Sequence, residues 1–94
     1  MLARTIANAL PLLMRERVLE AVLAAQALHG GPVTAQQART GRAERLMPHA
    51  RALTEVAWQI SRLGPDELGR SLHSAGKDRK GLALWWVEER RAET

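Results

Sequence analysis

The side chains best suited to acid–base or metal chemistry are scattered along this chain. Its three histidines, His29, His49 and His73, lie far apart and show no metal-ligand spacing such as H-E-x-x-H. The adjacent pair Glu88-Glu89 lies on the polar edge of a C-terminal element or tail. The chain contains neither a G-x-S-x-G motif nor a glycine-rich phosphate loop. We therefore expect no catalytic residue, no metal site and no cofactor, and predict that the protein is not an enzyme.

The absence of cysteine narrows the chemistry further. Without cysteine the chain has no disulfide, no thiolate metal ligand and no cysteine nucleophile. This composition fits a reducing compartment, and we predict a cytoplasmic protein. The longest apolar runs, residues 9–14 and 21–25, are far shorter than the roughly 20 residues of a membrane span. We expect no membrane partner.

Positive charge is concentrated in two segments. The formal net charge is +4, from 14 Lys and Arg against 10 Asp and Glu. The first segment, residues 39–51, contains one acid and the basic residues Arg39, Arg42, Arg45 and Arg51. The second, residues 70–80, contains one acid and the basic residues Arg70, Lys77, Arg79 and Lys80. Such clusters favour an acidic partner such as nucleic acid, and the alternative is that they are solvated faces of helices and turns.

The composition predicts a small, mainly α-helical domain. Ninety-four residues form one domain, residues 1–94, and the abundance of Ala and Leu with few β-branched residues favours helices. We predict four to five helices with a helix-turn-helix and a possible short β wing near the C-terminus. The expected parts are an N-terminal arm (1–11), a helical support (12–47), a helix-turn-helix-like unit (48–88) and a tail (89–94).

Local signals place the helices of the first half. Leu2, Ile6 and Leu10 predict a short helix, and Pro11 either interrupts it or opens the next one. An amphipathic pattern predicts a helix over 12–28. Thr34 and Gln37 have the spacing of a capping box, which predicts the start of another short helix.

A fourth helix is predicted over 48–63. Pro48 suits its first turn, and its apolar stripe is Ala50, Leu53, Val56, Ala57, Ile60 and Leu63. The opposite face carries Arg51, Thr54, Glu55, Trp58 and Arg62. Trp58 on this polar face either packs under a neighbouring element or contacts a partner.

A fifth helix is predicted over 65–75, directly after a tight turn. Pro65 at the first position, followed by Asp66 and Glu67, is typical of a helix start, and Gly76 would end the helix. Residues 82–87 are then either a strand, with Leu82, Leu84 and Trp86 on one face, or the start of a C-terminal helix. The short length of the segment and the preceding glycine favour the strand. No first strand opposite this segment is evident in the sequence.

The pair of helices 48–62 and 65–75 has the arrangement of a DNA-reading unit, in which one helix enters the major groove and the other braces it. Within the helix 65–75, Arg70 could read guanine, and Ser71, His73 and Ser74 could contact bases or phosphates. Arg51 joins this DNA-binding set from the preceding helix. The basic turn 77–80, with Lys77, Arg79 and Lys80, would contact phosphates.

The run Glu67-Leu68-Gly69-Arg70-Ser71-Leu72, the basic turn and the following apolar segment with tryptophan resemble a known family. The resemblance, over about residues 48–88, is to the winged helix-turn-helix domains of bacteriophage and mobile-element replication or regulatory proteins. It implies duplex DNA as the partner and a role as a regulator or replication accessory.

A protein-binding module is the alternative. In this interpretation the protein is a bacterial or phage-encoded adaptor or inhibitor, with Trp58, Trp85 and the Leu-rich N-terminal helix contacting a protein partner. A homodimer that buries the same apolar surfaces is compatible with both functions.

Overall fold

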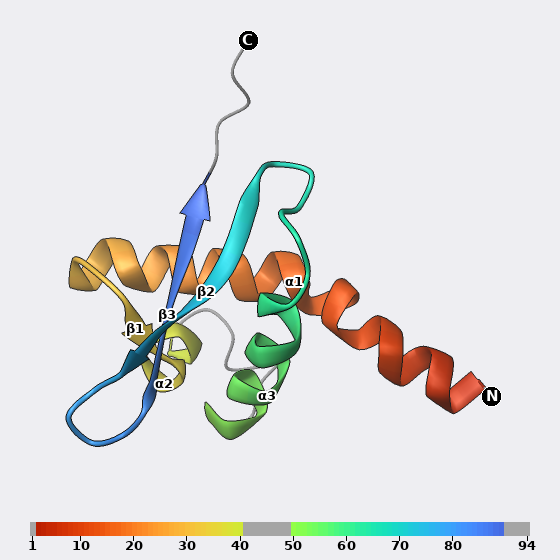
Figure 1. Cartoon of the computed structure of the whole chain (residues 1–94), viewed down its shortest axis with the longest axis horizontal. Helices are drawn as coiled ribbons and strands as arrows, with labels where there is room; N and C mark the ends of the chain where they lie inside the picture. The colour runs from red at the N-terminus through yellow and green to blue at the C-terminus, as the bar shows by residue number, and fades with distance from the viewer. Residues whose placement is uncertain (1, 41–49, 90–94) are drawn as a thin grey trace, which may run out of the picture.

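The protein folds into three helices and a three-stranded sheet (Figure 1). The structure, a computed structural model, describes residues 2–40 and 50–89, with side chains described from residue 14 on. The elements are α1 (Leu2–His29), β1 (Val33–Thr34), α2 (Ala35–Arg39), α3 (Ala50–Ser61), β2 (Arg70–Lys77) and β3 (Ala83–Glu89). The prediction of a mainly α fold with four to five helices is therefore wrong, since this is an α+β fold.

The sheet is antiparallel, with strand order β1-β3-β2. Val33 in β1 lies opposite Trp85, and Leu72 in β2 lies opposite Val87. The segment 82–87 is thus confirmed as a strand. The strand opposite it, which was not evident in the sequence, is β2. The register of β2 and β3 shifts between Ser74 and Lys77.

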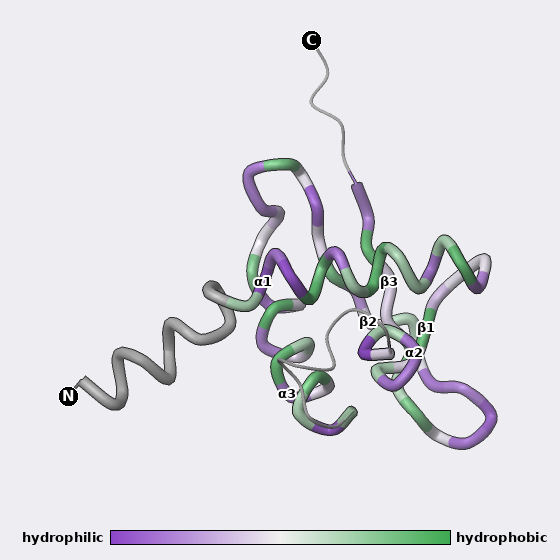
Figure 2. Tube along the Cα trace, turned by 180° about the vertical axis from the view of Figure 1, so that it is seen from behind, coloured by the Kyte–Doolittle hydropathy of each residue, from purple (hydrophilic) through white to green (hydrophobic). Residues whose placement is uncertain are grey.

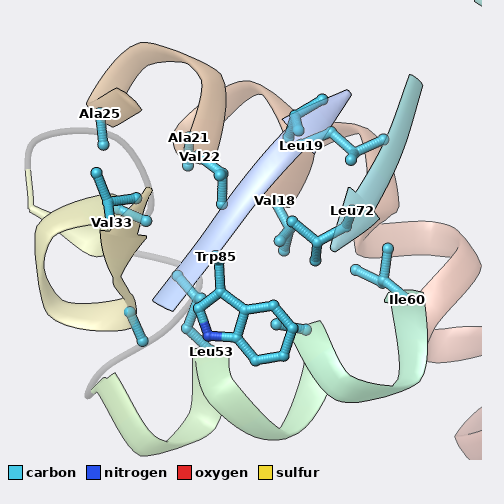
Figure 3. Packing of buried hydrophobic residues seen from close by; sticks show 14 of the residues in the cluster. Val18, Leu19, Ala21, Val22, Ala25, Val33, Leu53, Ile60, Leu72 and Trp85 are labelled. Atoms are coloured by element: carbon cyan, nitrogen blue, oxygen red, sulfur yellow. The ribbon is translucent and has the colours of Figure 1, made fainter. Parts of the chain in front are cut away.

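The core lies between the sheet and helices α1 and α3, and Trp85 is at its centre (Figure 3). Its largest fully buried side chains are Trp85, Leu19, Leu53, Ile60, Leu72, Val18, Val22 and Val33. In a chain without Phe or Tyr, one tryptophan supplies much of the volume needed for close packing.

The buried face of β3 carries Trp85 and Val87. Trp85 and Val87 are buried, so the alternation along the strand directs Leu84 and Trp86 to the other face. The prediction that Trp85 is an exposed contact residue is therefore wrong.

Helix α1 is continuous from Leu2 to His29, with Pro11 inside it. The predicted interruption is wrong, because proline removes one hydrogen bond and can bend a helix without ending it. The N-terminal part of α1 extends away from the sheet in Figures 1 and 2. The C-terminal part packs on the sheet and ends at Gly30, whose φ is 80°.

Two predicted helix signals are confirmed. The amide nitrogen of Gln37 donates to Thr34 Oγ1 (3.2 Å) and the amide nitrogen of Thr34 donates to Gln37 Oε1 (3.0 Å), which completes the capping box of α2. The apolar stripe over 50–60 is buried in α3. The predicted start at Pro48 lies outside the described residues.

The predicted helix 65–75 is wrong, because most of this segment is strand β2. Asp66 accepts hydrogen bonds from the amide nitrogens of Leu68 (2.9 Å) and Arg70 (2.8 Å), and these bonds close a turn. Gly69 has a φ of 76°, which does not continue a right-handed helix. The sequence Pro-Asp-Glu thus begins a turn here, and the following residues pair with β3.

Within residues 2–40 and 50–89, no helix combines the length and the apolar character that crossing a membrane requires.

Candidate nucleic-acid interface

Arg70, the predicted base-reading residue, is an internal ion-pair partner. Its Nε lies 2.9 Å from Asp66 Oδ2, and 11% of its side chain is exposed. The pKa of Asp66 is lowered below its ordinary value of 3.8, because burial raises it less than the hydrogen bonds from Arg70 and Leu68 lower it. Arg15 donates a hydrogen bond from Nη2 to the carbonyl oxygen of Gly64, at the start of the same loop. Arg70 therefore stabilises the loop before β2, and its side chain is not available to a partner.

The other three predicted residues of this helix lie along β2. Ser71 and His73 flank the buried Leu72 and so occupy the outer face of the sheet, whereas Ser74 is exposed farther along the strand. His73 Nε2 lies 3.2 Å from Glu88 Oε2, and the imidazole lies 4.9 Å from the ring of Trp86. The three side chains do not form one helical reading face with Arg70, because their positions follow strand alternation.

The basic turn between β2 and β3 does form an exposed cluster of cations. Asp78 turns its carboxylate onto the backbone, where Oδ1 accepts from the amide nitrogens of Lys80 and Leu82 (both 2.9 Å). Lys77, Arg79 and Lys80 are exposed and make no ion pair with a described residue. We refer to these three residues as the basic tip. The turn is coloured as hydrophilic in Figure 2.

Helix α3 presents a polar face beside its buried stripe. The exposed residues of this face are Arg51, Glu55, Trp58, Gln59 and Arg62, the last just beyond the helix end. Arg51 Nε lies 3.7 Å from Glu55 Oε1, and both side chains are so exposed that the pair contributes little to stability. The face carries one acid and two arginines. Gln59 was not identified from the sequence, although its helical spacing from Arg51 and Glu55 places it on this face.

Trp58 is both packed and exposed. Its ring lies 4.7 Å from that of the buried Trp85, with an interplanar angle of 75°, which is an edge-to-face contact. Even so, 42% of the residue is exposed. The packing alternative and the partner-contact alternative for Trp58 are therefore compatible, because one part of the indole is held by the core while the rest reaches solvent.

The helices α2 and α3 pack against each other, and α3 also contacts β2. In both views, α3 and the turn between β2 and β3 lie toward the same side of the molecule, opposite the end of β3 (Figures 1 and 2). Arg39 ends α2, whereas Arg42 and Arg45 of the first basic segment lie outside the described residues. We take the exposed face of α3 and the basic tip as the two parts of the candidate interface.

Among the described residues, no group of histidine and carboxylate side chains is placed to hold a metal ion. Comparison of the chain with protein-family models, with curated proteins and with solved structures found no match. The functional argument therefore rests on the geometry of the interface.

Proposed function

We propose that the protein binds duplex DNA, with α3 in the major groove and the basic tip on the phosphate backbone. The observation that carries this proposal is the basic tip. Its three cations are held at a turn whose only carboxylate is occupied by backbone amides. Because three cations outnumber the single carboxylate of Asp78, the turn has a net positive charge, which attracts the closely spaced phosphates of DNA.

The order of elements supports the proposal. The resemblance to winged helix-turn-helix domains, over about residues 48–88, implies a helix pair followed by a basic β turn. In this range α3 is followed by β2, the basic tip and β3, so the basic β turn is present and so is one helix of the pair. The helix we propose for the groove is α3, in place of the segment 65–75. A helix with side chains is about 10–12 Å across and the major groove is about 12 Å wide, so α3 can enter the groove.

The basic tip and α3 have different proposed roles because their exposed side chains differ. The basic tip contacts phosphates, which supplies affinity without sequence information, while the side chains of α3 reach base edges. Arg51, on the exposed face of α3, remains in the proposed DNA-binding set. Arg70 does not, because it is buried in its ion pair. With this binding mode, the role we propose is that of a regulator or replication accessory, as a monomer or a homodimer.

The protein-binding alternative has weaker support. Of its two tryptophan anchors, Trp85 is buried and Trp58 remains exposed. Among residues 14–40 and 50–89, the other exposed large apolar residues lie on different elements: Leu28 at the end of α1, Leu68 in the loop before β2, and Leu82 after the basic tip. The side chains of the Leu-rich N-terminal part, the third anchor of this alternative, lie outside the described ones. A contiguous apolar patch would favour this alternative more strongly.

The experiment is a fluorescence anisotropy titration of mixed-sequence duplex DNA at low and moderate salt. We expect binding that weakens with salt. Arg79→Ala should weaken binding to all duplexes alike, whereas the matched control Arg17→Ala, which removes an exposed arginine of α1, should not. No binding at micromolar protein in low salt would refute the proposal.

A further inference from the structure

We propose that Trp58 determines sequence preference by contacting the C5-methyl group of thymine in the major groove. This inference rests on the proposed DNA binding and assigns a specific ligand group to one side chain of α3. Trp58 stands on the exposed face of the helix, between Glu55 and Arg62.

The indole is positioned before a ligand arrives. Its edge-to-face contact with Trp85, at 4.7 Å, ties it to a side chain with no exposed surface. A side chain that is already ordered loses little conformational entropy on binding. The exposed part of Trp58 is therefore a rigid apolar surface on a helix face that otherwise carries polar groups.

The major groove offers one kind of apolar group to such a surface. Its base edges present hydrogen-bond donors and acceptors, except for the C5-methyl group of thymine. Arg62 lies one helical turn beyond Trp58, where it adds positive charge next to the apolar contact. The face around Trp58 carries two arginines, Arg51 and Arg62, against one acid, Glu55, so its net charge is positive. A positively charged face with one apolar surface suits a methyl group between phosphate backbones.

The test uses two duplexes that differ only in methyl groups. The first has alternating A·T pairs, and the second has the same sequence with uracil in place of every thymine. We expect the wild-type protein to bind the thymine duplex at least about fourfold more tightly, the effect of burying one methyl group. Trp58→Ala should bind both duplexes equally, and the control Leu28→Ala, which removes an exposed side chain at the end of α1, should keep the wild-type preference.

The outcomes separate this inference from the proposed function. Equal affinity of the wild-type protein for the two duplexes would refute the role of Trp58 and leave DNA binding intact, and this comparison needs no variant to fold. A preference that persists in folded Trp58→Ala would also refute it, because DNA shape or another residue would then sense the methyl group. Absence of binding to either duplex would refute both proposals.

A second pair of duplexes identifies the methyl source. G·C duplexes with cytosine or 5-methylcytosine place a methyl group at the same ring position. Tighter binding of the methylated duplex, lost in Trp58→Ala, would support recognition of the methyl group on either pyrimidine. Equal binding of this pair, together with a preference for thymine over uracil, would support recognition of thymine alone.

Discussion

Turns with the same backbone hydrogen bonds lie at both ends of β2, but the cations around the two turns differ. Asp66 and Asp78 each accept a hydrogen bond from the amide of the glycine three residues on, and each donates its own amide to the carbonyl four residues on. Each also accepts two backbone amides on Oδ1, from residues two and four positions later. Gly69 and Gly81 occupy corresponding positions with φ of 76° and 83°.

The difference lies in the cations around the two turns. In the Asp66 turn the fifth residue is Arg70, which is nearly buried and paired with Asp66 Oδ2. In the Asp78 turn the fifth residue is Leu82, and the cations of the basic tip point to solvent. The same backbone structure thus retains a cation inside the fold at one end of β2 and exposes cations to solvent at the other. Cation counts in the sequence do not distinguish these two roles.

The largest effect is expected from removing the carboxylate of the Asp66 turn. Asp66→Ala leaves Arg70 nearly buried without its partner, so the free energy of unfolding should fall by about 3 kcal/mol. The matched variant Asp78→Ala removes hydrogen bonds from an exposed turn and should cost about 1 kcal/mol. Urea denaturation measures both, and equal losses in the two variants would contradict the comparison.

The acid stability of the protein is the second test. Because the pKa of Asp66 is lowered in the folded state, its ionised form stabilises the fold above the ordinary value of 3.8. This contribution should be lost as the pH falls through the folded-state pKa. Asp66→Asn should flatten that part of the stability-versus-pH curve, which urea denaturation at a series of pH values would measure. An unchanged curve in Asp66→Asn would show that the ion pair does not favour the ionised carboxylate.

The two turns also show which parts of the fold can be predicted from the sequence. The capping box of Thr34 and the buried stripe of α3 depend on residues within one or two turns of a helix, so they were predictable. The sequence Pro-Asp-Glu is typical of a helix start, and here the same sequence begins the Asp66 turn. What separates them is the pairing of β2 with β3, through neighbours such as Leu72 and Val87 that are distant in sequence.

The candidate site was predictable to the same limited extent. The basic tip follows from composition and glycine placement, and its cations lie where the sequence analysis placed them, in a turn before a strand. The partners of Arg70 and Trp85 were not predictable, since burial of each depends on tertiary packing. The reading face that we propose therefore lies on α3 and not on the segment 65–75.

The smallest effect is expected from making the two turns alike. Leu82→Arg places an arginine at the fifth position of the Asp78 turn, as in the Asp66 turn. Because this turn is exposed, the new ion pair should change the free energy of unfolding by no more than about 0.5 kcal/mol. A stabilisation comparable with the loss in Asp66→Ala would show that burial is not what separates the two turns.

The salt dependence of DNA binding tests the role of the basic tip most directly. Three phosphate contacts contribute a slope of roughly −2.7 to a plot of log affinity against log salt, or about a fortyfold loss between 50 and 200 mM. We predict that the triple variant Lys77→Ala, Arg79→Ala, Lys80→Ala binds duplex DNA more weakly and with a slope shallower by about that amount. A folded triple variant with the affinity and the slope of the wild-type protein would contradict the proposed interface.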